Sequence, residues 1–262
     1  HFAPEGSVFV VFTAGGAGGE HIVRVDRSGG TLFPQRPSVR YPAVGFEKAG
    51  EEIYAVVSDP GQYTVYWSNG NTSAVGAENL PAEMTVGGDW RVRFDPAWGP
   101  TEPVTFGRLV SWTESSEPLI RYYSGKAVYE NEFDLDKKQI RDKKIVLDLG
   151  NVQDVAVIRL NGHEFPVSWC SPYEVDITPY VRAGCNSLSV DVVNLWPNRL
   201  IGDGKLPPGE RTTRSNISKY DAPDAGKYMR VSGLLGPVRV RFFEKTKITP
   251  QGKNRKTKTD TI

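Results

Sequence analysis

The 262 residues carry 32 Lys and Arg against 31 Asp and Glu, and 39% of them are hydrophobic, which is enough for one large core or two ordinary ones. The chain contains no run of about 18 apolar residues, so the sequence predicts no membrane span. Residues 1–244 are weakly acidic, with 26 basic and 30 acidic side chains, which argues against a nucleic-acid-binding surface.

The N-terminal third reads as short strands with a period of two residues, typical of β-structure. Ser68-Asn-Gly-Asn71 separates two of them and predicts a hairpin, because Asn-Gly accepts positive φ angles. The glycine-rich Ala14–Gly19 lacks the Lys-Ser/Thr ending of a phosphate-binding loop, and a strand follows it. We expect a small β-sandwich domain over residues 1–85, with strands at Ser7–Phe12, His21–Val25, Glu52–Val57, Gln62–Trp67 and Thr72–Val75.

Residues 86–245 show about eight further strands and no long amphipathic helix between them, which excludes an α/β barrel and favours a jelly-roll sandwich. Ile120–Phe133 reads as one long strand interrupted by a glycine. Thr178-Pro179 followed by Gly184 predicts a single helical turn. The remaining residues, 246–262, form a basic tail that we expect to be solvated.

Cys170 and Cys185 are too few for a disulfide framework or a cysteine zinc site. They flank one strand-turn-strand unit, so the sequence allows either a single bridge between them or two separate thiols.

The segment after residue 194 carries side chains that commonly hold sugars, because rings stack on C–H surfaces while amides and guanidinium groups bind hydroxyls. The loop Gly204–Lys227 is also long for a sandwich, and long ordered loops are often functional or lie against another domain. Two interpretations remain open: sugar contact, or Trp core anchors together with a charge pair, Arg199 with Asp203, that pins the loop. The candidate residues are Trp169, Trp196, Asn198, Arg199, Asp203, Arg214 and Tyr220.

Catalytic and metal chemistry have weaker support. Glycoside hydrolysis needs two facing carboxyl groups, and the pairs that invite attention are Glu130 with Glu132 and Asp203 with Glu210. A solvated strand edge explains the first pair as well. A calcium ion is the metal considered at strand ends, because calcium prefers carboxylate oxygens. The candidate residues that would coordinate it are Glu132, Asp134 and Glu244. No other cofactor is expected.

Six sequence elements stand out when they are taken in chain order. They are Trp90-Arg-Val-Arg-Phe94, Tyr123-Ser-Gly-Lys-Ala-Val-Tyr129, Val157-Ile-Arg-Leu-Asn-Gly162, Tyr173-Glu-Val-Asp-Ile177, Asn194-Leu-Trp-Pro-Asn-Arg-Leu-Ile-Gly-Asp203 and Ser232-Gly-Leu-Leu-Gly-Pro237. Their order resembles the C-terminal β-sandwich region of large bacterial glycoside hydrolases of the α-L-rhamnosidase-like family 106. Some of them are also similar to the galactose-binding-like, sugar-binding jelly roll of glycoside hydrolase family 2. The resemblance covers roughly residues 6–243 and departs from the pattern at Cys185, where Glu is commoner.

The resemblance implies a non-catalytic accessory region of a glycoside hydrolase acting on plant or microbial polysaccharide, with rhamnose as the sugar. The region would support or complete the active site of a catalytic domain that this sequence lacks. Its partners would be carbohydrate and that catalytic domain, in a periplasmic or extracellular bacterial location. Two alternatives remain: an autonomous carbohydrate-binding module, and a small complete glycosidase.

Overall fold

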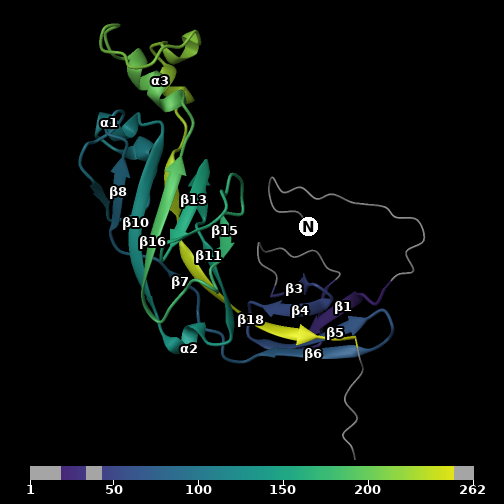
Figure 1. The fold of residues 1–262 in the computed structure, drawn as a ribbon. Helices are drawn as coiled ribbons and strands as arrows, with labels where there is room; N and C mark the ends of the chain where they lie inside the picture. The colour runs from purple at the N-terminus through teal and green to yellow at the C-terminus, as the bar shows by residue number, and fades with distance from the viewer. Residues whose placement is uncertain (1–18, 34–42, 251–262) are drawn as a thin grey trace, which may run out of the picture.

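The computed structural model describes residues 19–33 and 43–250, and they form an all-β protein of two sandwiches (Figure 1). The expected strand Ser7–Phe12, most of the glycine-rich Ala14–Gly19 and residues 251–262 of the basic tail lie outside these ranges. The all-β class with antiparallel sandwiches, predicted from the period-two segments, is confirmed.

The small sandwich packs a four-stranded antiparallel sheet against the far end of a larger sheet. Its core includes Val25, Tyr63, Val65, Trp67 and Ile248, all at most 5% exposed. The four-stranded sheet has the order β2 (Gly30–Phe33), β1 (Ile22–Arg27), β5 (Gly61–Trp67) and β6 (Thr72–Ala77).

The jelly roll encloses a second, larger core between its sheets. Strand alternation places Trp90, Val92 and Phe94 in that core and leaves Arg91 and Arg93 outside, as their spacing predicts. One sheet has the order β14 (His163–Glu164), β13 (Val155–Leu160), β16 (Gly184–Val193), β10 (Lys126–Leu135), β8 (Trp90–Phe94) and β9 (Val104–Phe106). The facing layer contains β15 (Glu174–Asp176), β11 (Lys143–Asp148), β18 (Arg239–Ile248), β7 (Met84–Thr85) and the pair β12 (Asn151–Gln153) and β17 (Gly233–Gly236).

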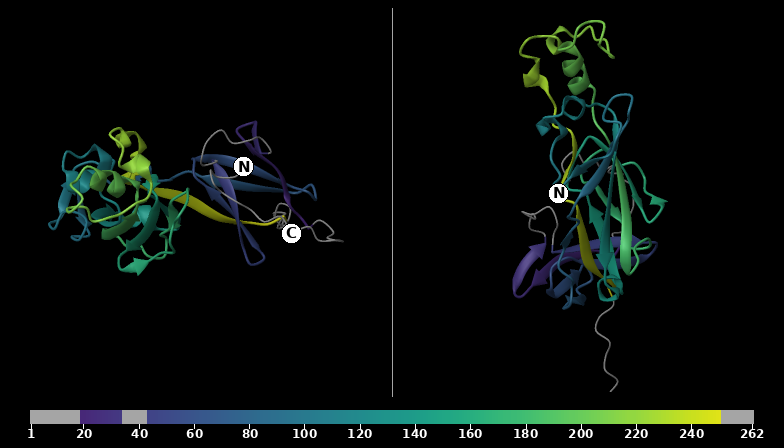
Figure 2. Two further views of the ribbon diagram at one scale, coloured as in Figure 1. Left: turned by 90° about the horizontal axis from the view of Figure 1, so that it is seen from above. Right: turned by 90° about the vertical axis from the view of Figure 1, so that its left-hand side faces the viewer.

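Strand β18 belongs to both sandwiches. Its first half, Arg239–Glu244, pairs with β11 in the jelly roll, and its second half, Glu244–Ile248, pairs with β4 (Glu52–Val57), which in turn pairs with β3 (Val44–Ala49). Figure 2 shows this strand passing from one body into the other. The boundary expected at residue 245, before the tail, therefore falls inside a strand.

The predicted hairpin turn is confirmed. Strands β5 and β6 pair antiparallel on either side of Ser68–Asn71. Strands β13 and β14 are joined through Asn161 and Gly162, whose φ angles are 50° and 86°. Two successive residues in the left-handed region are the requirement of a tight hairpin turn, and Asn-Gly meets it at low cost.

One strand prediction needs correction. The expected strand over Ile120–Phe133 begins only at Lys126, because Pro118 opens the short helix α1 (Pro118–Arg121), whose first turn the Glu117 carboxylate caps. The single helical turn expected after Thr178 is present, since the Ile177 carbonyl accepts the N–H groups of Tyr180 and Val181 at 2.9 and 3.1 Å, and no helix continues from it.

The alternation of Leu188, Val190 and Val192 predicts a strand that ends at a sheet edge around Pro197, whereas the structure forms helix α3 (Pro197–Gly204) there. Pro197 occupies a first-turn position of this helix, where its missing N–H costs no hydrogen bond.

In the described part of the chain, no helix is long and apolar enough to cross a membrane. The other short helices are η1 (Trp112–Glu114), α2 (Lys137–Ile140), η2 (Ser218–Tyr220) and η3 (Ala225–Tyr228).

Candidate functional site

Residues 195–232, which we call the cap, join β16 to β17 and lie at the end of the jelly roll far from α2 (Figure 1). The cap contains α3, η2 and η3, which pack on one another. Six of the seven residues selected as sugar-contact candidates lie in the cap, and the direction of each side chain shows what it can contact.

Asn198 points inward and is fully buried. Its amide donates hydrogen bonds to the Arg230 carbonyl at 2.7 Å and to the Ser232 hydroxyl at 2.8 Å, and its carbonyl accepts the Arg230 N–H at 2.7 Å. These bonds tie the start of the cap to its end, so Asn198 fixes the cap rather than facing a ligand.

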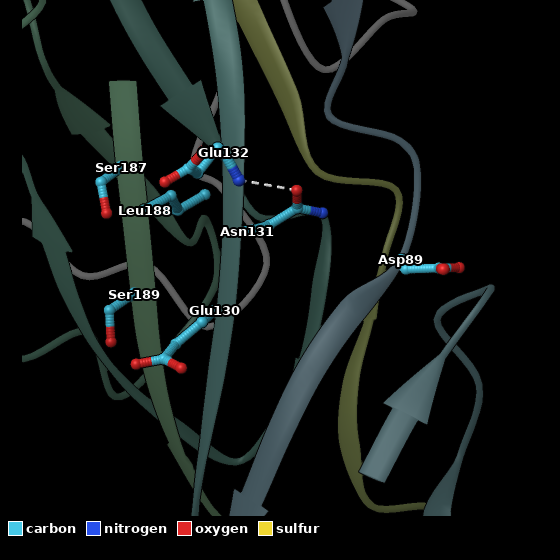
Figure 3. Close-up of a pocket in the computed structure, with 7 residues that line it drawn as sticks. All are labelled: Asp89, Glu130, Asn131, Glu132, Ser187, Leu188 and Ser189. Atoms are coloured by element: carbon cyan, nitrogen blue, oxygen red, sulfur yellow. Dashed lines mark hydrogen bonds between the residues drawn. The ribbon is translucent and has the colours of Figure 1, made fainter. Parts of the chain in front are cut away.

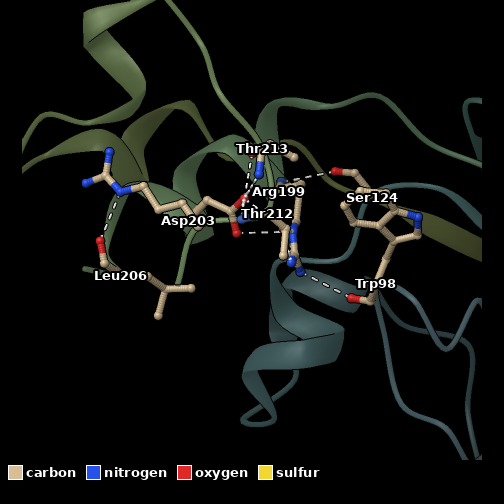
Figure 4. Close-up of polar contacts among 8 residues, drawn as sticks. Trp98, Ser124, Arg199, Asp203, Leu206, Thr212 and Thr213 are labelled. Atoms are coloured by element: carbon tan, nitrogen blue, oxygen red, sulfur yellow. Dashed lines mark hydrogen bonds and ion pairs between the residues drawn. The ribbon is translucent and has the colours of Figure 1, made fainter. Parts of the chain in front are cut away.

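Arg199 and Asp203 lie one turn apart on α3 and also point inward (Figure 4). Arg199 donates to the Trp98 carbonyl at 3.2 Å and to the Thr212 hydroxyl, while its Nε lies 3.2 Å from Asp203 Oδ1. Asp203 Oδ2 accepts the backbone N–H groups of Thr212 and Thr213 at 3.1 and 2.6 Å and both their hydroxyls. The geometry favours the second interpretation of this pair, in which it pins the loop.

The hydrogen-bond set explains the protonation state of Asp203. Burial alone would raise the pKa of this carboxyl group, but the bonds from Thr213 and Thr212 and the nearby Arg199 guanidinium outweigh it. The pKa of Asp203 is therefore lowered, and the group stays ionised at neutral pH. A carboxylate held in this way is a poor general acid, which removes the pair Asp203 and Glu210 from the catalytic candidates.

The two tryptophan candidates face solvent. Trp169, in the loop between β14 and β15, is 73% exposed, and Trp196 at the start of α3 is 54% exposed. Trp196 packs edge-on against Trp98, with ring centres 6.0 Å apart. The interpretation of both as core anchors is wrong, and both rings are accessible for stacking or for contact with another domain.

Arg214 and Tyr220 lie on the outer side of the loop. Arg214 is exposed, and no carboxylate of the described residues forms an ion pair with it. Tyr220 is half-buried, and the Lys219 ammonium lies 5.2 Å from its ring centre and 5.2 Å from that of Tyr228.

Asp154 is a residue that sequence reasoning missed. It lies between β12 and β13, where burial raises the pKa of its carboxyl group against the opposing effects of Arg230 and a hydrogen bond from the Leu195 N–H. Leu195 is next to Trp196 in the chain. Ser168, which is next to Trp169, forms an isolated β-bridge with Ala156, two residues after Asp154. The Asp154 carboxyl group is therefore a candidate for a functional surface, and no spacing in the sequence indicates it because the three segments meet only in the fold.

The outer face of β8, β10 and β16 carries a shallow polar groove (Figure 3). Glu130 is ion-paired with Arg93 at 2.6 Å, and Glu132 accepts the Cys185 thiol at 3.4 Å, which raises the pKa of that thiol. Both carboxylates stand on an open strand surface with no apolar wall. The arrangement agrees with the solvated strand edge considered for this pair.

The calcium candidates do not come together. Glu132 and Asp134 are exposed on β10, whereas Glu244 lies on β18 in the facing layer, with an ion pair to Lys143 at 2.5 Å. No three His, Cys, Asp or Glu side chains of the described residues form a cluster suited to a metal ion. Cys170 and Cys185 are both free thiols, so the allowed bridge is not formed.

Residues 84–232 match the family described as glycosyl hydrolases family 2, sugar binding domain. A candidate beta-glucuronidase of Formosa agariphila (strain DSM 15362) is 34% identical over 208 residues, which cover 70% of this chain and 18% of that protein. The rhamnosidase of Novosphingobium sp. PP1Y has the same fold, with 24% identity and a TM-score of 0.54 over 84% of this chain and 24% of its own. The Ruminococcus gnavus beta-glucuronidase is 26% identical over 43% of this chain and 21% of its own, with a TM-score of 0.38.

The chain spans about a fifth of the length of the Formosa agariphila protein and about a quarter of the rhamnosidase. The family match covers more than half of the chain and contains the jelly roll up to β16 and the whole cap, ending just before β17 and β18. This chain belongs to the sugar-binding domain family of the family 2 glycosyl hydrolases.

Proposed function

We propose that this chain is a non-catalytic accessory region of a glycoside hydrolase whose catalytic domain lies elsewhere in the same polypeptide. The observation that carries the proposal is the family 2 sugar-binding domain over residues 84–232, built on a fold in which one carboxylate of each candidate pair is engaged in another contact. Asp203 is held by Thr212 and Thr213, and Glu130 is paired with Arg93.

The surface that would meet the catalytic domain is the end of the jelly roll around the cap. Five apolar side chains there are between 51% and 73% exposed. Proteins rarely expose a large group of apolar side chains unless another domain or a ligand covers it. Asp154 and Arg230 add charged groups beside them. The five are Val167, Trp169, Leu195, Trp196 and Val231.

The proposal extends to the sugar that the whole hydrolase recognises. The fold likeness to a rhamnosidase supports an α-L-rhamnoside, in line with the resemblance in the sequence, and the candidate beta-glucuronidase makes a β-D-glucuronide the specificity to test beside it. Both are O-glycosidic substrates. We also propose a bacterial origin and a periplasmic or extracellular location, which fractionation of the source cells followed by immunodetection would test.

A second candidate function is an autonomous carbohydrate-binding module, favoured by the exposure of Trp169 and Trp196. Calorimetric titration of the chain with neutral monosaccharides and oligosaccharides, rhamnose included, separates the two. The accessory role predicts no saturable heat, because its sugar contacts need the catalytic domain. Saturable binding that is lost in Trp169→Ala or Trp196→Ala, with the fold intact, would establish the autonomous module instead.

A further inference from the structure

The cap is more basic than the rest of the protein. It contains seven Lys and Arg residues and four Asp and Glu residues. All other residues of the chain together include 25 basic and 27 acidic residues. Three of the seven have a carboxylate within the cap: Arg199 with Asp203, Arg211 with Asp221, and Lys227 with Asp224. The other four, which have no ion-pair partner among the described residues, are Lys205, Arg214, Lys219 and Arg230.

The inner side of the cap accounts for its rigidity without using these cations. Asn198 ties the start of the cap to its end, and Asp203 holds Thr212 and Thr213 with four hydrogen bonds. The unpaired cations are exposed on the outside of a segment that is already held in place. Their backbone positions are therefore fixed before any ligand arrives, so that binding has to order only the side chains.

Two of the cations meet aromatic rings around the C-terminal end of α3. Gly204 lies so close to η2 that a β carbon there would be 2.8 Å from the Tyr220 carbonyl oxygen. The Lys205 ammonium, next in the chain, is 5.4 Å from the Tyr122 ring centre. The Lys219 ammonium lies 5.2 Å from the ring centres of both Tyr220 and Tyr228. The end of α3 together with η2 and η3 therefore brings the cations and the ring faces together.

We propose that the outer surface of the cap binds anionic carbohydrate, with Lys205 and Lys219 taking the carboxylate or sulfate groups and Tyr220 and Tyr228 taking sugar rings. Cations select acidic sugars over neutral ones, and ring faces distinguish a sugar from a bare polyanion. Single exposed ion pairs are weak, so the ligand is a polymer that presents several acidic groups at once. This inference rests on the proposed role of the region in carbohydrate processing.

The test is affinity electrophoresis of the whole chain through gels containing polygalacturonate, dextran sulfate, neutral dextran or polyphosphate. Retardation by polygalacturonate or dextran sulfate, and not by neutral dextran, is expected. It should fall at least about five-fold in Lys205→Gln/Lys219→Gln, and it should weaken as salt rises because exposed charges are screened within about 8 Å at physiological ionic strength. Tyr228→Leu should weaken binding of the two polysaccharides while leaving polyphosphate unaffected.

Two controls keep the result specific. Lys137→Gln/Lys138→Gln removes two equally exposed lysines from α2, at the opposite end of the jelly roll, and should leave retardation unchanged (Figure 1). Substitution of Lys253, Arg255, Lys256 and Lys258 by Gln removes the charge of the basic tail. All four lysines of the first two double variants are exposed, so these variants keep the fold.

The proposal is overturned if the tail or the α2 variant loses retardation and the cap variant does not. It is equally overturned if polyphosphate is bound as strongly as polygalacturonate and Tyr228→Leu has no effect, since that would be a general attraction for polyanions. These outcomes are independent of catalysis and of neutral-sugar binding, which test the accessory role.

Discussion

Asn198 and Ser232 are 34 positions apart in sequence, yet the Asn198 amide donates to the Ser232 hydroxyl at 2.8 Å inside the protein. The same hydroxyl receives the Asn194 amide at 3.0 Å. The side-chain amides of Asn194, just before the cap, and of Asn198, within it, thus both donate to the hydroxyl of the last cap residue. The cap is a closed, internally bonded unit whose outward side chains are free to meet a ligand or a partner domain.

Asp203→Asn should destabilise the cap by about 3 kcal/mol, the cost of removing one partner from a buried, hydrogen-bonded charge pair. Asn at this position turns a donor toward the Thr212 and Thr213 donors and leaves Arg199 without its charge partner. Urea unfolding followed by the fluorescence of Trp98 and Trp196 measures the change. Asp224→Asn is the control, because it removes an exposed carboxylate that pairs with Lys227 on the surface, and it should leave the midpoint unchanged.

The contribution of Asp203 should depend on pH. Its pKa is lower in the folded protein than in the unfolded chain, where an aspartate titrates near about 3.9. The stabilisation is therefore fully present above that value and is lost as the pH falls through the folded pKa. The stability difference between the parent chain and Asp203→Asn should shrink as urea midpoints are measured from pH 6 downward to about pH 2, whereas a constant difference would contradict this assignment.

Asp154→Asn should stabilise the chain at neutral pH. The raised pKa of Asp154 means that the folded state disfavours the charged form, so this group costs stability above the folded pKa and the cost disappears as the pH falls below it. The amide oxygen of Asn can still accept the Leu195 N–H. A higher thermal midpoint at pH 7, with no difference at low pH, is expected; a lower midpoint at pH 7 would show that the Arg230 attraction outweighs burial.

The two kinds of tryptophan should respond differently to truncation. Trp169→Ala removes a ring that is 73% exposed and should change the unfolding free energy by no more than about 0.5 kcal/mol. Trp112→Ala should cost about 3–5 kcal/mol, because this ring is fully buried and its indole donates to the Tyr129 hydroxyl at 2.6 Å. A large loss for Trp169→Ala in urea unfolding would place that ring in a structural contact.

The shared strand predicts that the two sandwiches unfold together. Thr246→Pro alters β18 where it pairs with Ala55 of β4, and proline in a sheet interior is strongly disfavoured. This variant should separate one thermal transition into two, with the small sandwich, which contains Trp67, melting first. A single transition at an unchanged temperature would show that the pairing of β18 with β4 does not couple the cores.

Much of the fold follows from local sequence signals. The alternation in Trp90–Phe94 and the Asn161-Gly162 turn predict a strand and a hairpin because side-chain period and φ preference act over a few residues. The continuity of β18 across both sandwiches does not follow, since Arg239–Ile248 reads the same whether its partners are one sheet or two.

The candidate site was harder to predict for a physical reason. Asn198, Arg199 and Asp203 have the right chemistry for sugars, but the same chemistry satisfies backbone groups, and only α3 decides which way they point. Pro197 is compatible both with the end of a strand and with the first turn of a helix, and in the structure it opens α3. The sequence does not indicate Asp154 or Lys219, because the Arg230 charge that acts on Asp154 and the Tyr228 ring near Lys219 belong to other elements of the fold.

The most direct test of the accessory role is hydrolysis of p-nitrophenyl α-L-rhamnoside and p-nitrophenyl β-D-glucuronide by the isolated chain at about 10 µM. We expect no release of nitrophenol above the rate without protein, since each candidate pair of carboxyl groups has one member held in another contact, Asp203 by Thr213 and Glu130 by Arg93. Release that saturates with substrate and disappears in Glu130→Gln/Glu132→Gln would contradict the account and identify a small complete glycosidase.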